Sequence, residues 1–344
     1  DTFFTPDYAY FSSTSSSFLL HAKDFSEKII KELNLNETSN VVEVASNDGY
    51  LLKNFVAANI PCLGIEPTKS TAEAAKKLNI TVIEKFFGEE LGKELVREGK
   101  QADLIIGNNV YAHVPDINDF TKGLKALLKA DGTITLEFPH LMCLIQQTQF
   151  DTIYHEHFSY LSLHTVKRIF EKSGLKIWNV EKIMTHGGSL RIYGCHENYK
   201  RDINKKVDIL LAEEIKCKLQ SLETYLSFQF KIEKIIDKFK LFLIKQKHSG
   251  KKVAAYGAAA KGNTLLNYAG VNTDLVSVVY DASESKQGKY MPGSHIPIKD
   301  PDDMKEFNPD CILILPWNIQ DEIKNKIVSS FSMDKLVVSI NDFK

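Results

Sequence analysis

The chain has 344 residues, with 43 basic and 44 acidic side chains and a formal net charge of −1. This length is typical of two domains, and a hydrophobic content of 43% is enough for two cores. The balanced charge excludes the strongly basic surface that gathers nucleic acid or anionic lipid, so we expect neither a nucleic-acid nor a membrane partner. No apolar run reaches the roughly 18 residues that a membrane span requires.

The cysteines are few and widely spaced, and no two of them form a C-x-x-C pair. The five positions are Cys62, Cys143, Cys195, Cys217 and Cys311. This spacing favours neither a disulfide framework nor a zinc site, so we expect no metal in this chain and a reducing, cytoplasmic setting. The opening residues, Asp1 to Phe4, do not have the pattern of a secretory leader.

The first half of the chain alternates helical and strand patterns. An amphipathic pattern from Phe18 to Leu33 predicts a helix after a hydroxyl-rich opening segment. Short β-branched runs then predict five strands, at Val41–Val44, Cys62–Glu66, Thr81–Ile83, Asp103–Ile106 and Thr133–Glu137. Continuous apolar strands separated by helices are typical of a doubly wound, mostly parallel α/β sheet with both faces covered.

The second half predicts a reversed end to this sheet and then a second α/β unit. After a helix near His164–Lys172, the strands Leu175–Val180 and Ser189–Cys195 lie too close in sequence to be parallel. We expect a core at 1–200, a helical connector or oligomer surface at 201–248, and a smaller Rossmann-like domain at 249–344. Its predicted strands are Val253–Tyr256, Val276–Tyr280, Cys311–Leu315 and Leu336–Ile340.

The turn after the first strand has the composition of a cofactor site without a pyrophosphate. In an open parallel sheet, ligands bind at the carboxyl ends of the strands. This turn contains one glycine in place of G-x-G-x-x-G, but it offers several side-chain oxygens. The candidate residues are Glu43, Ser46, Asn47, Asp48 and Gly49, together with Glu66 at the end of the second strand. Oxygens in this arrangement suit hydroxyls and an ammonium, so the pattern favours S-adenosylmethionine (SAM).

Polar residues also follow the fourth strand. Asn108 and Asn109 stand where side-chain amides would contact the cofactor, and His113 would lie over the same edge. Ordinary turn residues and a helix N-cap at Asp116 are the alternative interpretation. The position at the ligand-binding edge of the sheet favours function.

The densest cluster of titratable side chains is Tyr154, His155, Glu156 and His157. Two imidazoles, a carboxylate and a phenol can supply a general base, a group that orients it and a donor to a developing oxyanion. These groups suit removal of a proton next to a carbonyl. A metal site is the competing interpretation, but the H-x-x-x-H spacing of helical zinc sites is absent.

Two glycine turns are candidates for phosphate recognition. One contains His186 and precedes Arg191, whose guanidinium could bind a phosphate, although a plain hairpin needs no function. The other opens a helix in the last domain, although it lacks the Walker A pattern. Its candidate residues are Tyr256, Gly257, Lys261 and Asn263.

Taken together, these motifs resemble the SAM-dependent nucleotide-sugar C-methyltransferases of deoxysugar pathways. The resemblance rests on segments spread over nearly the whole chain. These are Asp7–Ser15, Glu43–Gly49, Asn108–Asp116, Tyr154–His157, His186–Arg191, Gly257–Asn267, Lys286–Pro297 and Pro316–Asn318. The last domain makes the resemblance specific, because methyltransferases at large do not share it.

The resemblance implies a class I methyltransferase core, a Rossmann-like domain that helps to bind the nucleotide-sugar, and an N-terminal zinc module. No cysteine precedes Cys62, so we expect that module to be absent or removed here. The implied reaction removes the C3 proton of a 4-keto sugar and methylates C3, with S-adenosylhomocysteine (SAH) as product. His157 is then the first choice for the base, Glu156 orients an imidazole, and Tyr154, Tyr8 and His113 act as donors or relays.

Other enzyme classes stay open at this point. An O- or N-methyltransferase would use the same cofactor, and an NAD-dependent nucleotide-sugar dehydrogenase or epimerase would share the α/β domains. A non-catalytic binding subunit is a further possibility. We expect a small-molecule nucleotide-sugar partner and a monomer or weak homo-oligomer.

Overall fold

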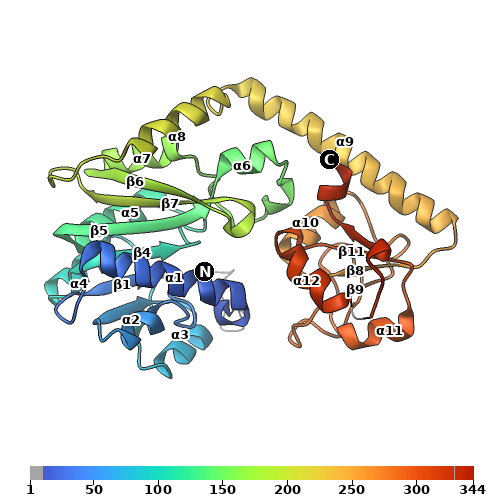
Figure 1. The fold of residues 1–344 in the computed structure, drawn as a ribbon, viewed down its shortest axis with the longest axis horizontal. Helices are drawn as coiled ribbons and strands as arrows, with labels where there is room; N and C mark the ends of the chain where they lie inside the picture. The colour runs from blue at the N-terminus through green and yellow to red at the C-terminus, as the bar shows by residue number, and fades with distance from the viewer. Residues whose placement is uncertain (1–10, 329) are drawn as a thin grey trace. The chain divides into compact units, whose positions relative to one another are not determined.

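The computed structural model describes residues 11–328 and 330–344, and these residues form two compact units. Within the described residues, the first unit comprises 11–141, 158–184 and 188–217, and the second comprises 142–157, 185–187, 218–328 and 330–344. The chain therefore leaves the first unit twice before residue 218. Tyr154 to His157 and the turn 185–187 belong to the second unit. Figure 1 colours the chain by residue number and labels its helices and strands.

The first unit contains a seven-stranded sheet in the order β3-β2-β1-β4-β5-β7-β6. Its strands are β1 (Val41–Val44), β2 (Cys62–Ile65), β3 (Thr81–Ile83), β4 (Ala102–Asn108), β5 (Leu128–Pro139), β6 (Leu175–Ile183) and β7 (Ser189–His196). All neighbouring pairs are parallel except those of β7, which is antiparallel to β5 and to β6. The predicted class I methyltransferase fold is confirmed, and the reversed strand, last in sequence, lies one place inside the edge.

Helices cover both faces of this sheet, as the fully buried β1 requires. The helices of the first unit are α1 (Ser16–Leu33), α2 (Leu52–Ala57), α3 (Lys69–Lys76), α4 (Glu89–Arg97), α5 (Ile117–Leu127), α7 (Leu163–Lys172) and α8 (Lys205–Lys216). Phe25 and Ile29 of α1 share a core with Phe55 of α2, Leu104 of β4 and Tyr193 of β7. Helices α4, α5 and α7 pack against one another in sequence order.

The second unit contains a five-stranded parallel sheet in the order β10-β9-β8-β11-β12. Its strands are β8 (Val253–Tyr256), β9 (Val278–Tyr280), β10 (Ile298–Lys299), β11 (Cys311–Ile314) and β12 (Leu336–Val338). Its helices are α6 (Leu141–Gln146), α9 (Leu222–His248), α10 (Ala260–Tyr268), α11 (Met304–Phe307) and α12 (Gln320–Ile327). The two-residue β10 was not predicted from the sequence.

The two helices of segment 201–248 belong to different units. Helix α8 packs against β6 and α7 of the first unit, whereas α9, the long yellow to orange helix of Figure 1, packs against β8. The apolar residues of α9 recur at helical spacing and face the second unit. They are Phe228, Ile232, Ile235, Ile236, Phe239 and Leu243. No helix in the described part of the chain is both long enough and apolar enough to cross a bilayer.

Candidate functional site

The turn that follows β1 is held in an unusual backbone conformation. Ala45, Asn47 and Gly49 all have positive φ, at 59°, 49° and 78°. A Cβ on Gly49 would lie 2.5 Å from Ile80 Cδ1 and 3.3 Å from the Ala75 Cα, so a larger residue there would strain the turn. This winding turn brings several successive polar side chains to the carboxyl end of β1.

Glu66 fixes the shape of this turn from the end of β2. Its Oε2 accepts a hydrogen bond from the Asn47 backbone N–H at 2.9 Å, and its Oε1 accepts one from the Thr68 N–H at 2.9 Å. Residues just before α1 reach the same turn, because the Ser12 N–H donates to Asn47 Oδ1 and the Ser13 N–H donates to Asp48 Oδ2. The opening segment and two strand ends therefore converge on one turn.

Several buried oxygens at these strand ends are unsatisfied. Within residues 11–328 and 330–344, five of them have no hydrogen-bond partner: Glu43 Oε2, Ser46 Oγ, Asp48 Oδ1, Asn108 Oδ1 and Asn109 Oδ1. Two are amide oxygens, which accept only, two belong to carboxyl groups, and the fifth is a hydroxyl. An unpaired buried acceptor is costly, so this set fits a ligand rich in N–H and O–H donors.

The electrostatics of the turn favour a cation. Burial raises the pKa of Glu43 well above its usual value, and the neighbouring carboxylates of Glu66, Asp48 and Glu137 raise it further. Like charges this close stabilise a bound positive group, which relieves their mutual repulsion. The sulfonium and ammonium of SAM are two such groups.

The end of β4 adds the two asparagines. Asn108 is buried, and Asn109 has a φ of 54° with its N–H donating to the Glu137 carbonyl at 2.8 Å. Tyr111 points instead into the core, where its hydroxyl is 2.7 Å from Thr121 Oγ1. Asp116 is the N-cap of α5, and its carboxylate accepts from the N–H groups of Asn118 and Asp119. His113 lies in this loop and is half-buried.

The four residues Tyr154 to His157 differ in their exposure to solvent. Tyr154 and His157 stack with ring centroids 4.3 Å apart, and His155 is exposed. His157 Nδ1 lies 2.8 Å from the Thr152 carbonyl oxygen, so Nδ1 carries a proton and donates it in a hydrogen bond. The neutral ring then has its lone pair on Nε2, as a general base requires.

Burial shifts both acid–base groups of this cluster toward their neutral forms. It lowers the pKa of His157, as does the positive charge of Lys261, while the hydrogen bond to Thr152 opposes them. Burial also raises the pKa of Glu156. A neutral imidazole with a lowered pKa stays competent to take a proton at mildly acidic pH.

The phosphate candidates of the second unit lie at the first turn of its sheet. Tyr256 ends β8, Gly257 follows with a φ of 95°, and Lys261 and Asn263 lie in the first turns of α10. Lys261 Nζ donates to Asn318 Oδ1 at 2.8 Å, and burial lowers the pKa of Lys261 to about 8. Asn263 Oδ1 is buried without a hydrogen-bond partner in the described part of the chain.

His186 and Arg191 belong to different units. His186 lies in the turn 185–187 of the second unit, with a φ of 54°. Arg191 lies in β7 of the first unit, where its Nε donates to Glu137 Oε1 at 2.7 Å and its guanidinium covers the Phe25 ring. The Arg191 side chain is only 6% exposed. Its guanidinium is therefore already engaged by carboxylates of its own unit.

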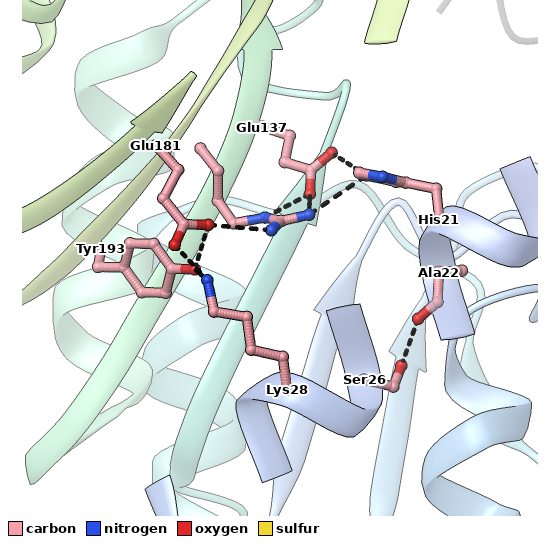
Figure 2. Close-up of polar contacts among 8 residues, drawn as sticks. His21, Ala22, Ser26, Lys28, Glu137, Glu181 and Tyr193 are labelled. Carbon is pink, nitrogen blue, oxygen red and sulfur yellow. Dashed lines mark hydrogen bonds and ion pairs between the residues drawn. The ribbon is translucent and has the colours of Figure 1, made fainter. Parts of the chain in front are cut away.

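Arg191 pairs with Glu137 and Glu181, and Figure 2 labels these two residues and the other members of the ionic network. His21 of α1 contacts Glu137 of β5 at 2.9 Å, and Lys28 of the same helix pairs with Glu181 of β6. The Tyr193 hydroxyl donates to Glu181 Oε2 at 3.0 Å. Burial opposes ionisation of Glu137, but its contacts with His21 and Arg191 outweigh burial and keep its pKa below the usual value. The network fixes α1 to the sheet.

Two functional candidates were missed by sequence reasoning. Asp151 is completely buried, and its Oδ2 accepts a hydrogen bond from Trp317 Nε1 at 2.7 Å. Asp281 follows β9, and its Oδ2 accepts from the Ala258 N–H at 2.6 Å, as Glu66 does in the first sheet. The position of Asp281 at the end of a second strand was a usable signal, whereas nothing in the sequence pairs Asp151 with Trp317. Tyr8 lies outside the described residues.

No group of three or more His, Cys, Asp or Glu side chains in residues 11–328 and 330–344 is arranged to hold a metal ion. Cys62, Cys195 and Cys311 are free thiols.

Comparisons with known structures give matches of low identity that each cover about half of this chain. A protein from Pyrococcus horikoshii matches at 14% identity and a TM-score of 0.45, over 54% of this chain and 94% of its own. The magnesium protoporphyrin IX methyltransferase ChlM from Synechocystis, solved with bound SAH, matches at 12% identity and a TM-score of 0.42. That match covers 52% of this chain and 83% of ChlM.

Comparisons of sequence are more specific. A family described as a methyltransferase domain matches residues 19–180, and one described as a C-methyltransferase C-terminal domain matches residues 184–340. The C-methyltransferase NovU from Streptomyces niveus is 33% identical over 316 residues, which make up 92% of this chain and 75% of NovU. The resemblance stated from the motifs is confirmed at this level, and the chain belongs to the SAM-dependent C-methyltransferase family.

Proposed function

We propose that this chain transfers a methyl group from SAM to C3 of a 4-keto-deoxyhexose linked to a nucleoside diphosphate. The observation that carries the proposal is the hydrogen bond from His157 Nδ1 to the Thr152 carbonyl, at 2.8 Å. This hydrogen bond keeps a proton on Nδ1, so that Nε2 of the neutral imidazole can take a proton from carbon. The imidazole stacks on the phenol ring of Tyr154. An oxygen or nitrogen nucleophile gives up its proton far more readily and needs less of this preparation.

SAM fits the unsatisfied oxygens at the ends of β1 and β4. Glu43, Ser46 and Asp48 would accept from its ammonium, and Asn108 and Asn109 would contact its amino-acid and adenosyl parts. Glu66 would accept from the ribose hydroxyls with the lone pairs that its two backbone donors leave. The backbone of Asn47 and the close packing of Gly49 shape this turn. When bound, SAM supplies an electrophilic methyl group and leaves as SAH.

His157 would take the C3 proton on Nε2. The electron pair of the C–H bond then forms the enolate, whose negative charge gathers on the C4 oxygen. Tyr154 and His113 would donate hydrogen bonds to that oxygen, as would Tyr8, and Glu156 would orient an imidazole. General-base catalysis of this kind typically contributes about 10²–10⁴-fold to the rate.

The second unit would hold the nucleoside diphosphate. Lys261 and Asn263 stand at the start of α10, where backbone N–H groups favour an anion, and Tyr256 and Gly257 precede them. His186 is a further candidate for this role. Because Arg191 is engaged by Glu137 in the first unit, we leave it out of the proposed diphosphate site. We place the reaction in the cytoplasm, where the thiols stay reduced.

A panel of substrates tests this function. The purified chain is incubated with SAM and 4-keto sugars carrying dTDP, GDP or CDP, and the products are analysed by mass spectrometry. We expect the gain of one CH₂ on one nucleotide class, located at C3 by NMR, and none with His157→Asn. Methyl on an oxygen or nitrogen atom would contradict C-methylation, and turnover with NAD alone would indicate a dehydrogenase or epimerase.

A further inference from the structure

Trp317 connects three segments of the second unit that are far apart in sequence. It lies in the 3₁₀ turn Trp317–Ile319 after β11, and its side chain is buried. The indole N–H donates to Asp151 Oδ2 at 2.7 Å, across 166 positions of the chain. Asp151 lies in the 3₁₀ turn Phe150–Thr152, which the chain inserts into the second unit.

Two further groups contact the Trp317 ring. Lys261 Nζ lies 4.8 Å from the ring centroid, within the range of a cation–π contact. On the turn 185–187, a Cβ added to Gly187 would lie 2.6 Å from Trp317 Cζ3. The Gly187 carbonyl in turn accepts from Gln149 Nε2 at 2.7 Å. Trp317 thus contacts both inserted segments and the first turn of α10.

The connection from Trp317 reaches His157 through two short steps. Asp151 is followed directly by Thr152, and the Thr152 carbonyl is the acceptor of the His157 Nδ1 hydrogen bond. Any rotation of the turn Phe150–Thr152 therefore moves the group that sets the tautomer of His157. Asp151 is the only residue of this turn with a buried ionisable side chain, and its hydrogen bond to Trp317 is one of the contacts that hold the turn.

We propose that Trp317 and Asp151 are positioning residues, which hold the Thr152 carbonyl in place and so present His157 as a base. This inference rests on the proposed function, in which His157 removes the C3 proton. It adds that an indole from the C-terminal sheet sets the geometry of that base. Neither Trp317 nor Asp151 needs to touch the substrate for this role.

The burial of Asp151 explains why the indole matters. Asp151 Oδ1 has no hydrogen-bond partner in residues 11–328 and 330–344, so Trp317 is the side-chain donor that the carboxylate has there. Burial raises the pKa of Asp151 to about 6, while Trp317 and the charges of Lys261 and Lys344 oppose this rise. Without the indole N–H, the carboxylate would take up a proton or move toward water, and the turn would move with it.

Trp317→Phe is the direct test, and the chain offers a matched control. Its other tryptophan, Trp178 in β6, is similarly buried, and its Nε1 has no acceptor in the described part of the chain. Trp317→Phe should lower kcat about 100-fold, since a misplacement of about 1 Å can cost that much, with the Kd for SAM unchanged. Trp178→Phe should leave kcat within about threefold of the parent, and circular dichroism checks folding of both.

Asp151→Asn separates the hydrogen bond from the charge. The asparagine keeps an oxygen that accepts from the indole, so it should retain far more activity than Trp317→Phe. In the Trp178→Phe background Trp317 is the sole indole, and its fluorescence should titrate near pH 6 as Asp151 takes up a proton. Adding Asp151→Asn should abolish that transition and leave any change near pH 8 that comes from Lys261.

A readout that needs no turnover keeps this proposal separate from the proposed function. The ¹⁵N chemical shifts of His157 in the ligand-free full chain report which ring nitrogen carries the proton. Trp317→Phe should shift His157 away from the Nδ1–H form, whereas Trp178→Phe should not. Unchanged His157 shifts in Trp317→Phe, or an unchanged kcat in an active enzyme, would overturn the proposal. If the parent enzyme is inactive on every 4-keto sugar, that result counts against the proposed function. The ¹⁵N chemical shifts of His157 would still decide this inference.

Discussion

His157 Nδ1 donates a hydrogen bond to the backbone carbonyl of Thr152 at 2.8 Å. This contact decides which form of the imidazole is present when the ring is neutral, because Nδ1 keeps its proton and Nε2 keeps its lone pair. Burial of His157 and the nearby Lys261 favour the neutral ring. The four residues Tyr154 to His157 therefore differ in environment, and our proposal assigns the proton transfer to the last of them.

Replacing His157 with asparagine should lower kcat about 10²–10⁴-fold, because the reaction loses its proton acceptor. His155→Asn is the matched control, since His155 is exposed, and it should retain nearly full activity. Binding of SAM, measured by calorimetry, should be nearly unchanged in both variants. Equal losses of activity in the two variants would show that His157 has no special role.

The pH dependence of kcat/KM should reflect the lowered pKa of His157. The base works only when neutral, so activity rises with pH as His157 loses its proton. Because burial and Lys261 lower this pKa below the ordinary histidine value of about 6.5, the acid limb should lie below that pH. The midpoint is measured with a stable 4-keto sugar at saturating SAM. An acid limb centred above 6.5 would contradict the assignment.

Glu43→Gln should affect binding and stability in opposite directions. Burial and three neighbouring carboxylates raise the pKa of Glu43 in the folded chain. The folded state therefore binds more protons than the unfolded state, and stability falls as pH rises through the range between the two pKa values. At neutral pH and without SAM, Glu43→Gln should raise Tm.

The same variant should bind SAM more weakly, because one carboxylate facing the cationic cofactor is lost. Calorimetry in buffers of different ionisation enthalpy should also show proton release from the parent on binding SAM, and less release from Glu43→Gln. A variant that is less stable without SAM and binds SAM normally would assign Glu43 to the structure of the turn alone.

Arg191→Met should destabilise the first unit strongly. Removing the guanidinium leaves the 1% exposed side chain of Glu137 without its main partner, and breaking a buried ion pair typically costs about 3–5 kcal/mol. The control is Lys182→Met, which breaks the exposed pair with Glu213 and should cost less than about 1 kcal/mol. Urea unfolding measures both. If Arg191→Met lowers the affinity for substrate and leaves the free energy of unfolding unchanged, Arg191 would have to be assigned to the diphosphate site after all.

Gly187→Ala should disturb the second unit more than its backbone strain alone explains. Gly187 has a φ of 86°, and a Cβ there would press on the Trp317 ring. Gly270 has a φ of 65°, and a Cβ added there would meet no atom within 4 Å, so Gly270→Ala measures the strain by itself. Overpacking typically adds about 1–3 kcal/mol. Equal free energies of unfolding for the two variants would show that Gly187 does not pack against Trp317.

The sequence predicted the parts of the fold that local patterns determine. Buried β-branched runs such as Val41–Val44 identified the strands, and the closeness of the predicted strands Leu175–Val180 and Ser189–Cys195 identified the antiparallel pair β6 and β7. Glu66 could be placed because the end of a second strand is a fixed point of this fold. The two-residue β10 has too few residues to give a pattern, so it was missed.

Contacts between residues that are far apart along the chain could not be predicted from the sequence. Asp151 and Trp317 are 166 positions apart, and their hydrogen bond depends on a chain that enters the second unit at 142–157 and again at 185–187. For Arg191 a local pattern was present, because the nearby glycine turn suggested that its guanidinium binds a phosphate. Its cross-strand neighbours Glu137 and Glu181 become visible only once the strand register is known.

Exchange of the C3 proton with solvent tests the central claim most directly. The chain is incubated with SAH and the 4-keto sugar in deuterated water, so that methyl transfer is impossible, and the C3 signal is followed by NMR. We predict that deuterium replaces the C3 proton in the parent enzyme and does so far more slowly in His157→Asn. A C3 proton that persists in the parent while the same preparation methylates the sugar would contradict carbanion formation at this carbon.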